Sequence, residues 1–285
     1  RLRIARQLMT KQVRDFWHAK VLLVTGGSSG LGWFIAQAFG RAGAKVCING
    51  RDEARLRDAV QRLQDDNIEA FPFTADVTSD EQVAAMFADI QQQHGRLDAL
   101  VNNAGRSDRG AALETSVEEF RELLELNFLG LVRCTQVAMP KLLESGGHLV
   151  NISSLAAKTV SPFLCVYPAS KFPVTAYSHQ LRLELGPQGL HVLLVCPGPV
   201  ALPQASDRYE KLAAQKHLPA AAGKPGGGVH LKGIDPVRLA ERIVRACEKR
   251  TPEIVVPGRA RWLFAISNIW PRLGDWIIRK MTSDR

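Results

Sequence analysis

Short runs of β-branched and aliphatic residues alternate with longer amphipathic stretches from residue 20 to about residue 256. The short runs predict strands at 21–25, 45–49, 69–73, 98–102, 148–153, 191–196 and 253–256. Because helix-length stretches separate these runs, the pattern is typical of repeated βαβ units. Right-handed crossovers then place helices on both faces of a seven-stranded parallel sheet, which predicts a single doubly wound α/β domain.

Three of the expected helices carry chemical markers at their first turn. These are the capping-box spacings of Ser79 with Gln82 and of Ser116 with Glu119, and the N-cap Asp235 followed by Pro236. The alternation breaks at residues 200–233, a stretch rich in Gly, Pro and Ala that is too long for an ordinary connection. We interpret 200–233 as a mobile substrate-covering loop within a domain that spans 20–257.

The remaining segments, 1–19 and 258–285, are predicted to be basic amphipathic extensions. Residues 1–20 contain six basic side chains and one acidic one, and residues 258–285 contain six basic and two acidic ones. The net charge of +9 therefore arises at the two ends, and the body between them is neutral on balance. This distribution argues against nucleic-acid binding, which requires a basic patch on the domain itself.

The same two ends hold Trp17, Trp262, Trp270 and Trp276, four of the five tryptophans. Basic residues interleaved with amphipathic aromatic rings favour contact with an anionic membrane surface, and packing of the extensions on the domain or a second subunit is the alternative. No run approaches the roughly 18 apolar residues of a spanning helix. The expected location is cytoplasmic, with membrane association as the alternative. Since the chain begins at Arg1, an upstream anchor or signal stays open.

The cysteines and histidines predict no metal site. The five cysteines are widely spaced, with no C-x-x-C pair or histidine nearby in the sequence, which favours reduced and mostly buried thiols. The seven histidines are scattered along the chain. A G-x-S-x-G elbow is missing as well, which argues against serine-hydrolase chemistry.

A glycine-rich stretch, Thr25-Gly-Gly-Ser-Ser-Gly-Leu-Gly32, joins the first predicted strand to a helix. Glycines at this junction let the backbone approach a pyrophosphate, and the helix N-terminus offers amides to the anion. The stretch predicts a dinucleotide site, and a tight turn with no ligand is the alternative. At the end of the second strand, Gly50 stands where an NAD site uses an acidic residue, and Arg51 can bind a 2′-phosphate. NADP is therefore favoured over NAD, unless Arg51 is only a solvated residue at a helix start.

Tyr167 and Lys171 lie four residues apart in Tyr-Pro-Ala-Ser-Lys, at the head of a helical pattern. Positions i and i+4 share a helix face, so the ammonium can lie near the phenol. A nearby cation lowers the pKa of a phenol from its usual value near 10 and makes it a usable base.

Together with other motifs, this pair resembles the short-chain dehydrogenase/reductase family, which has a Rossmann-type fold. The quoted motifs are the Thr25–Gly32 stretch, Asp76-Val77, Asn102-Asn103-Ala104-Gly105, Asn127, Ser153-Ser154, Tyr167-x-x-x-Lys171 and Pro197-Gly198-Pro199-Val200. They occur in the family's order and spacing from about residue 20 to residue 200. Two positions depart from the family pattern: Leu202 replaces a common threonine, and Pro173 is expected to bend the helix that follows Lys171.

The resemblance implies a role for each matched residue. It implies that the catalytic set is Asn127, Ser154, Tyr167 and Lys171, with Ser154 rather than Ser153 holding the substrate carbonyl and Asn127 holding a water linked to the lysine. It implies NADP(H) contacts at Gly26, Ser28, Ser29, Gly30, Leu31, Gly32, Gly50, Arg51, Asp76, Val77, Asn103, Ala104, Gly105, Tyr167, Lys171, Pro197, Gly198 and Val200. Asp76 would accept from the adenine amine, and the Pro197 segment would meet the carboxamide.

These roles predict an NADPH-dependent oxidoreductase, a carbonyl reductase or alcohol dehydrogenase in which Tyr167 transfers the proton. The flexible cover and the C-terminal stretch favour an apolar, lipid-like substrate. Two alternatives stay open: a non-catalytic NADPH-binding or membrane-tethered scaffold, and a redox-neutral enzyme on the same fold. The family commonly assembles through the helices that contain Asn127 and Tyr167, which implies a homodimer or homotetramer.

Overall fold

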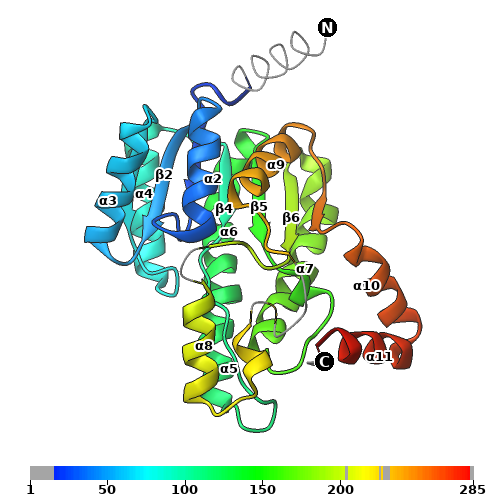
Figure 1. The fold of residues 1–285 in the computed structure, drawn as a ribbon. Coiled ribbons are helices and arrows are strands. Elements are labelled where there is room, and N and C mark those ends of the chain that lie inside the picture. Colours follow the sequence, from blue (N-terminus) through cyan, green and yellow to red (C-terminus); the bar gives the residue numbers. More distant parts are fainter. Residues whose placement is uncertain (1–15, 203–204, 225, 227–231, 283–285) are drawn as a thin grey trace, which may run out of the picture.

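The computed structural model describes residues 16–202, 205–224, 226 and 232–282, and its centre is one parallel sheet (Figure 1). The strands are β1 (Val21–Val24), β2 (Lys45–Gly50), β3 (Ala70–Thr74), β4 (Ala99–Asn102), β5 (His148–Ile152), β6 (His191–Pro197) and β7 (Glu253–Val256). Their order across the sheet is β3-β2-β1-β4-β5-β6-β7. All seven predicted strands are confirmed, each boundary within one residue.

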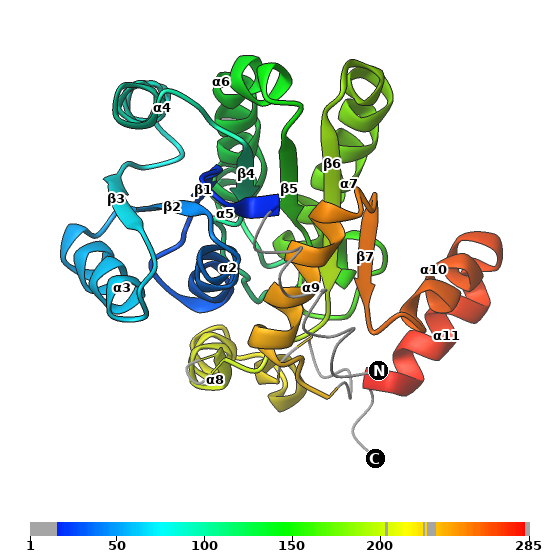
Figure 2. The same ribbon diagram turned by 90° about the horizontal axis from the view of Figure 1, so that it is seen from above.

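Helices cover both faces of the sheet (Figure 2). One face carries α2 (Gly30–Arg41), α3 (Glu53–Asp65) and α9 (Pro236–Glu248), and the other carries α4 (Asp80–His94), α6 (Gly130–Glu144) and α7 (Val166–Leu185). Alternate strand residues separate these layers, since Leu22 and Val24 pack with the first set of helices and Val21 and Leu23 with the second. The doubly wound Rossmann-type fold is therefore confirmed.

The remaining helices lie outside the two main layers. They are α5 (Val117–Leu124), a π-helical turn η1 (Glu125–Leu129), short 3₁₀ turns η2 (Leu155–Ala157), η3 (Gly186–Gln188) and η4 (Ala220–Gly223), and the helices α8 (Ala205–Gln215), α10 (Ala260–Ile269) and α11 (Pro271–Thr282). The last two, α10 and α11, form a helical hairpin beyond the edge strand β7 (Figure 2). In the described residues, none of the helices combines the length and apolarity needed to cross a bilayer.

The helix starts expected from the sequence are present, with one difference. Ser116 and Glu119 form a complete capping box, and Asp235 accepts from the first amides of α9. Ser79 accepts from the Gln82 amide, but the Gln82 side chain accepts from the Asp76 amide instead of completing the box. Gln82 thereby ties the start of α4 to the end of β3.

Trp17 does not lie on a surface, and its expected membrane role is wrong. Its side chain is fully buried, its ring lies 4.7 Å from that of Phe39, and its indole N–H donates to Glu248 Oε1 at 3.0 Å. Because these contacts join the segment before β1 to the end of α9, Trp17 is part of the domain core, with Phe16 packed against it and His18 and Ala19 exposed. The rest of the predicted N-terminal extension lies outside the described residues.

Part of the predicted 200–233 covering loop is helical. The helix α8 packs on η4 so closely that a Cβ on Gly223 would lie 3.2 Å from Glu210 Cα, and Ala213 and Ala222 are buried between them. Alanines and a glycine therefore allow two short elements to touch, where the composition alone suggested an irregular loop. Residues 203–204, 225 and 227–231 of this stretch lie outside the described residues.

Candidate active site

A cavity of about 1330 Å³ lies at the carboxyl ends of the strands. Of the residues assigned to cofactor or catalysis from the sequence, those that line it are Gly26, Ser28, Ser29, Gly30, Leu31, Gly50, Arg51, Val77, Asn103, Ala104, Gly105, Ser154, Tyr167, Lys171, Pro197, Gly198 and Val200. Gly32, Asp76 and Asn127 are not among the lining residues. The topology thus brings most of the assigned residues to one edge of the sheet, where open α/β folds bind ligands.

The glycine-rich turn is shaped by backbone contacts with the loop after β4. Gly26 has a φ of +61°, and a Cβ there would lie 3.0 Å from Ala104 Cα. A Cβ on Gly32 would lie 2.4 Å from Gly26 O, so only glycine lets α2 approach the turn this closely. Thr25 Oγ1 accepts from the amides of Asn103 and Ala104 at 3.0 and 3.1 Å. Gly32 therefore builds the turn without facing the cavity.

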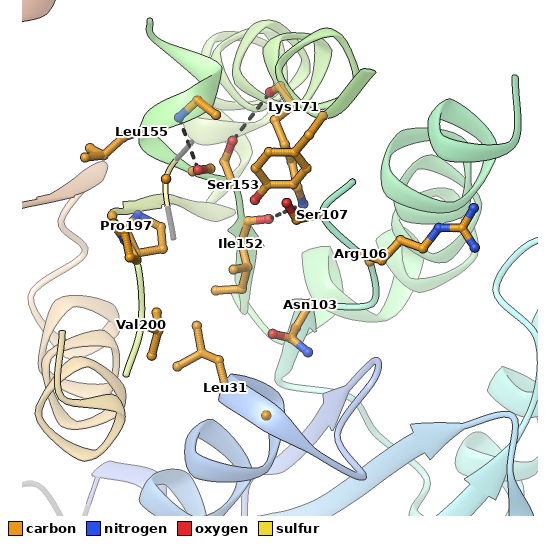
Figure 3. A pocket seen from close by; sticks show the side chains of 18 of the residues that line it. Leu31, Asn103, Arg106, Ser107, Ile152, Ser153, Leu155, Lys171, Pro197 and Val200 are labelled. Carbon is orange, nitrogen blue, oxygen red and sulfur yellow. Dashed lines mark hydrogen bonds between the residues drawn. The ribbon is translucent and has the colours of Figure 1, made fainter. Parts of the chain in front are cut away.

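Asn103 also acts mainly on this turn. Its Nδ2 donates to Thr25 O at 3.0 Å and to Gly26 O at 3.1 Å, so the side chain holds the glycine-rich turn against the loop after β4. Figure 3 shows Asn103 and Leu31 on one side of the pocket, facing Lys171 and Ile152 on the other. Because the turn is held open and the first turn of α2 contains no acidic residue, these residues fit a pyrophosphate.

The end of β2 offers a basic surface beside this turn. Arg51 is exposed, and its Nη1 donates to Asp76 Oδ2 at 3.3 Å. Burial opposes ionisation of Asp76, but hydrogen bonds from Thr78 and Arg51 outweigh it and lower the pKa of this carboxyl. Arg55 on α3 lines the cavity as well, although sequence reasoning missed it. Its place one helical turn after Arg51 was the available signal.

The two serines after β5 separate into different environments. Ser154 lines the cavity, accepts from the Ala156 amide at 3.1 Å, and hydrogen-bonds the Tyr167 phenol. Ser153 is buried, and its hydroxyl donates to Lys171 O at 3.4 Å (Figure 3). The structure therefore places Ser154, and not Ser153, beside the phenol.

Tyr167 and Lys171 lie on the first turns of α7. Lys171 is buried and its Nζ donates to Ile152 O at 3.0 Å, and burial lowers the pKa of this ammonium to about 8 (Figure 3). Burial raises the pKa of Tyr167 to about 12, while the Ser154 hydrogen bond and the charge of Arg109 act to lower it. Desolvation of the phenol is thus the largest effect here, whereas the sequence-based expectation considered only a neighbouring cation.

Asn127 stands in the π-helical turn η1, which lies between α5 and α6. Its Nδ2 donates to Arg106 O and to Ser170 Oγ, and its Oδ1 accepts from the Arg106 amide, each at 2.9 Å. A Cβ on Gly105 would lie 2.7 Å from Asn127 Oδ1 and 3.6 Å from Lys171 Nζ. Asn127 therefore holds the loop after β4 against α7, close to the lysine. The extra residue of a π turn commonly occurs at functional sites.

The departures from the family pattern have small structural consequences. Pro173 lies inside α7, which continues as one helix from Val166 to Leu185. Leu202 lines the cavity, and its Cδ1 would contact a Cβ on Gly30 at 3.7 Å. An aliphatic group therefore stands where a hydroxyl would face the cofactor.

The far end of the cavity comes from parts of the chain that carry no motif. Arg109 and Tyr209 line it beside Tyr167, and Arg109 is buried although it is charged. The helical hairpin adds a set of apolar side chains, namely Leu263, Phe264, Ile266, Ile277, Ile278 and Met281. Sequence reasoning missed all of these, because no local pattern shows that α8, α10 and α11 fold against the strand ends.

At the opposite edge of the sheet, His148, His191 and Cys247 come together in the core, with ligand atoms within 4.8 Å of one another. Two hydrogen bonds account for the rings, one between the Nδ1 atoms at 2.9 Å and one from His191 Nε2 to Thr251 O at 2.9 Å. Burial lowers the pKa of His148 to about 3 and raises the pKa of Cys247. Neutral imidazoles and a thiol are therefore favoured at this position.

The fold and this cavity agree with the comparisons to known proteins. The profile of the family described as short chain dehydrogenase matches residues 20–213, and the chain belongs to that family. A putative ketoacyl reductase of Streptomyces coelicolor is 37% identical over 268 residues, 90% of this chain and 98% of that protein. Dehydrogenase/reductase SDR family member 7B of Danio rerio is 33% identical over 265 residues, 89% of this chain and 82% of that protein.

Among solved structures, an actinorhodin polyketide ketoreductase variant with NADPH superposes with a TM-score of 0.74 at 31% identity, covering 83% of this chain and 95% of that one. The chain is thus an oxidoreductase of the short-chain dehydrogenase/reductase family.

Proposed function

We propose that this oxidoreductase is an NADPH-dependent carbonyl reductase, able to run the reverse oxidation of the alcohol. The observation that carries the proposal is that Ser154, Tyr167 and Lys171 line the same cavity as the glycine-rich turn, with Ser154 hydrogen-bonded to the Tyr167 phenol. A phenol hydrogen-bonded to a serine and placed one helical turn from a lysine is a proton donor for a growing alkoxide.

The cofactor assignment is supported by the residues at the strand ends. The glycine-rich turn and the N-terminus of α2 would hold the pyrophosphate, and Arg51 with Arg55 would bind a 2′-phosphate beside Gly50. NADPH supplies the hydride when it is bound. The relative solved with NADPH is consistent with this choice. Val77, Ala104, Gly105 and the Pro197–Val200 segment would line the rest of the cofactor.

Four side chains of the protein bind the carbonyl oxygen, transfer the proton and hold the site in place. Ser154 donates a hydrogen bond to the substrate carbonyl oxygen, which orients the carbonyl and stabilises the negative charge that develops on it. Tyr167 gives its phenolic proton to the same oxygen, and Lys171 supplies positive charge near the phenolate that results. Asn127 keeps the loop after β4 in contact with α7, and so maintains the position of Lys171.

An apolar, lipid-like substrate is supported by the lining of the far end of the cavity. Six apolar side chains of α10 and α11 face this space, whereas the catalytic end carries the polar groups. An elongated ketone would place its carbonyl at Tyr167 and its hydrocarbon part against the hairpin. Burial of each aliphatic side chain against such a substrate contributes on the order of 1 kcal/mol.

The test of the enzymatic function is Tyr167→Phe, assayed by oxidation of NADPH over a panel of ketones. We expect turnover to fall by about 10²- to 10⁴-fold with NADPH affinity retained, because the ring stays and only the proton donor is lost. If the variant keeps every activity of the parent protein, the chain is an NADPH-binding scaffold. If no carbonyl compound consumes NADPH stoichiometrically, a redox-neutral reaction on this fold replaces the proposal.

We also propose that the hairpin places the enzyme on an anionic membrane surface. Trp262, Trp270 and Trp276 are 75%, 61% and 57% exposed, while other residues of the same helices line the cavity. The described part of the segment from residue 258 onward holds five basic side chains and one acidic one, so its charge complements anionic lipid.

Flotation with vesicles of phosphatidylcholine and phosphatidylserine tests this surface. The full chain should float with anionic vesicles, and a triple variant with Trp262, Trp270 and Trp276 replaced by Ser should stay at the bottom. Equal recovery of both proteins with the vesicles would remove the proposal. A change of oligomer mass in the triple variant would assign the face to a second copy of the chain.

A homodimer or homotetramer is proposed from α6 and α7. Val137, Phe172 and Leu183 on these helices are 40%, 44% and 76% exposed. An apolar surface on the helices that carry the catalytic residues suits a second copy of the same chain. Light scattering after size exclusion measures this, and a monomer at assay concentration would contradict it.

A further inference from the structure

Arg109 is a buried cation that the catalytic scheme above does not use. It belongs to the loop between β4 and α5, and its side chain is 2% exposed. Its Nε donates to Ala222 O at 2.7 Å, its Nη1 donates to Ser107 Oγ and Asp108 O at 2.8 Å, and its Nη2 donates to Lys224 O at 3.4 Å. Every one of these acceptors is a neutral oxygen.

Burying a guanidinium costs desolvation free energy, and hydrogen bonds to neutral acceptors offset this cost less than an ion pair would. The Asp108 carboxylate accepts from the backbone amide of Arg109 at 2.7 Å, and Lys216 pairs with the same carboxylate at 3.8 Å. An uncharged side chain could fill this volume without the loss of solvation. The retained positive charge is therefore the feature that needs a reason.

Arg109 joins the cover to the strand ends. Two of its hydrogen bonds reach Ala222 and Lys224 at η4, more than a hundred residues further along the chain. Its guanidinium carbon lies 4.0 Å from the ring centroid of Tyr209 on α8, within the range of a cation–π contact. The N–H groups of the planar guanidinium donate to the carbonyl oxygens, and its flat face stacks on the Tyr209 ring. A lysine ammonium cannot make both contacts at once.

Arg109 and Tyr167 line the same cavity, and the charge of Arg109 acts on the phenol. The charged and titratable groups that act on Tyr167 come from three elements: Arg109 on the loop after β4, Tyr209 on α8 and Cys196 on β6. Lys171 on α7 lines the same cavity. Tyr209 and Cys196 oppose ionisation of the phenol, and Arg109 favours it. The interaction is reciprocal, since the Tyr167 charge likewise favours the charged form of Arg109.

We propose that Arg109 is a positioning residue with two linked effects: it fastens α8 and η4 over the substrate, and its positive charge assists Tyr167 whenever the phenol gives up its proton. The inference rests on the proposed carbonyl reduction, because it assigns a second cation to the same proton transfer. Lys171 lies on α7, and Arg109 reaches the same cavity from the loop between β4 and α5, where η4 and α8 hold its side chain.

Two substitutions separate the anchor from the charge. Arg109→Met removes both, and Arg109→Lys keeps the charge but loses the fork and its contacts with η4. In alcohol oxidation, which needs the phenolate, we expect Arg109→Met to move the acidic limb of the kcat/KM profile upward by roughly one pH unit, a loss of about tenfold below it. Arg109→Lys should leave the limb in place and raise KM. Arg121→Met, which removes an exposed arginine paired with Glu118, is the matched control and should change neither.

A direct titration makes the outcome independent of turnover. The chain has three tyrosines, so the ultraviolet absorbance of phenolate in the NADP⁺ complex, minus that of Tyr167→Phe, isolates the catalytic phenol. Arg109→Met should move this titration to higher pH by the same amount as the rate profile. If no carbonyl or alcohol is turned over, the proposed function fails while this measurement still reports on Arg109.

Three results decide the proposal. A profile and a titration that stay in place in Arg109→Met overturn it. Equal loss of activity in the Met and Lys variants, with the profile unmoved, overturns it as well, because Arg109 would then be an anchor only. If circular dichroism shows that Arg109→Met does not fold, Arg109→Gln, which keeps amide donors without the charge, answers the same question.

Discussion

The two walls of the cavity are built on different principles. One wall consists of the strand ends, the glycine-rich turn and the start of α7, where polar groups are held by backbone hydrogen bonds. The other consists of α8, α10 and α11, which place Tyr209 and apolar side chains on the cavity, together with Arg109, which η4 anchors. The exposed tryptophans of the hairpin lie on the outside. In the proposed function, the first wall holds the cofactor and the reacting groups, and the second wall selects the substrate.

Among the substitutions that test this comparison of the two walls, the largest effect is expected at Ser154 in the first wall. Ser154→Ala removes the hydrogen bond to the carbonyl oxygen, and we expect kcat to fall by about 10²- to 10³-fold, as for loss of one oxyanion donor. The loss should be the same for a small ketone and for a long apolar one, because Ser154 touches only the reacting group. Steady-state assays of both ketones check this. A loss confined to the long ketone would place Ser154 in substrate binding and not in the reaction.

A smaller effect is expected where the first wall meets the cofactor phosphate. Arg51→Ala removes a charge-assisted hydrogen bond worth about 1.5–3 kcal/mol, so the preference for NADPH over NADH should fall by roughly 10- to 100-fold. The ratio of the kcat/KM values for the two cofactors measures it. Arg57→Ala is the matched control, since Arg57 lies nearby on α3, pairs with Glu53 and is not among the residues that line the cavity. If Arg51→Ala leaves the NADPH-to-NADH ratio of kcat/KM unchanged, Arg51 does not bind the 2′-phosphate and only forms its ion pair with Asp76.

The first wall could be predicted from the sequence because its geometry is local. Each assigned residue follows directly after a strand or opens a helix, and parallel strands end at one edge of the sheet, so the strand pattern alone brings Gly26, Asn103, Ser154 and Pro197 together. The interpretation of Ser154 over Ser153 came from the resemblance to the family. The structure adds a reason, since Ser153 turns inward to the Lys171 carbonyl.

The second wall could not be predicted because its contacts join distant parts of the chain. Arg109 reaches Ala222, 113 residues away. The same reason applies in the core, where Trp17 reaches Glu248, 231 residues away. Composition treated residues 200–233 as a loop and the C-terminal segment as a membrane-facing tail, because neither pattern reveals what the inner face of a helix covers. The burial of Tyr167, which raises its pKa, depends on the same tertiary packing.

The smallest expected effect tests the second wall. Ile277 and Ile278 of α11 line the cavity and are half-buried. The double substitution to Ala removes apolar area worth on the order of 1–2 kcal/mol in contact with a bound chain, so KM for a long apolar ketone should rise by roughly tenfold. The values for a small ketone and for NADPH should stay unchanged, since both bind at the other wall.

The matched control for this pair is Leu273→Ala, on the same helix. Leu273 is 44% exposed and is not among the residues that line the cavity, so its truncation should leave the long ketone unaffected. If Leu273→Ala and the double variant raise KM equally, the hairpin acts by its overall stability and not by contact with substrate. If neither raises it, the hydrocarbon part of the substrate lies elsewhere, and the division of labour between the two walls is wrong.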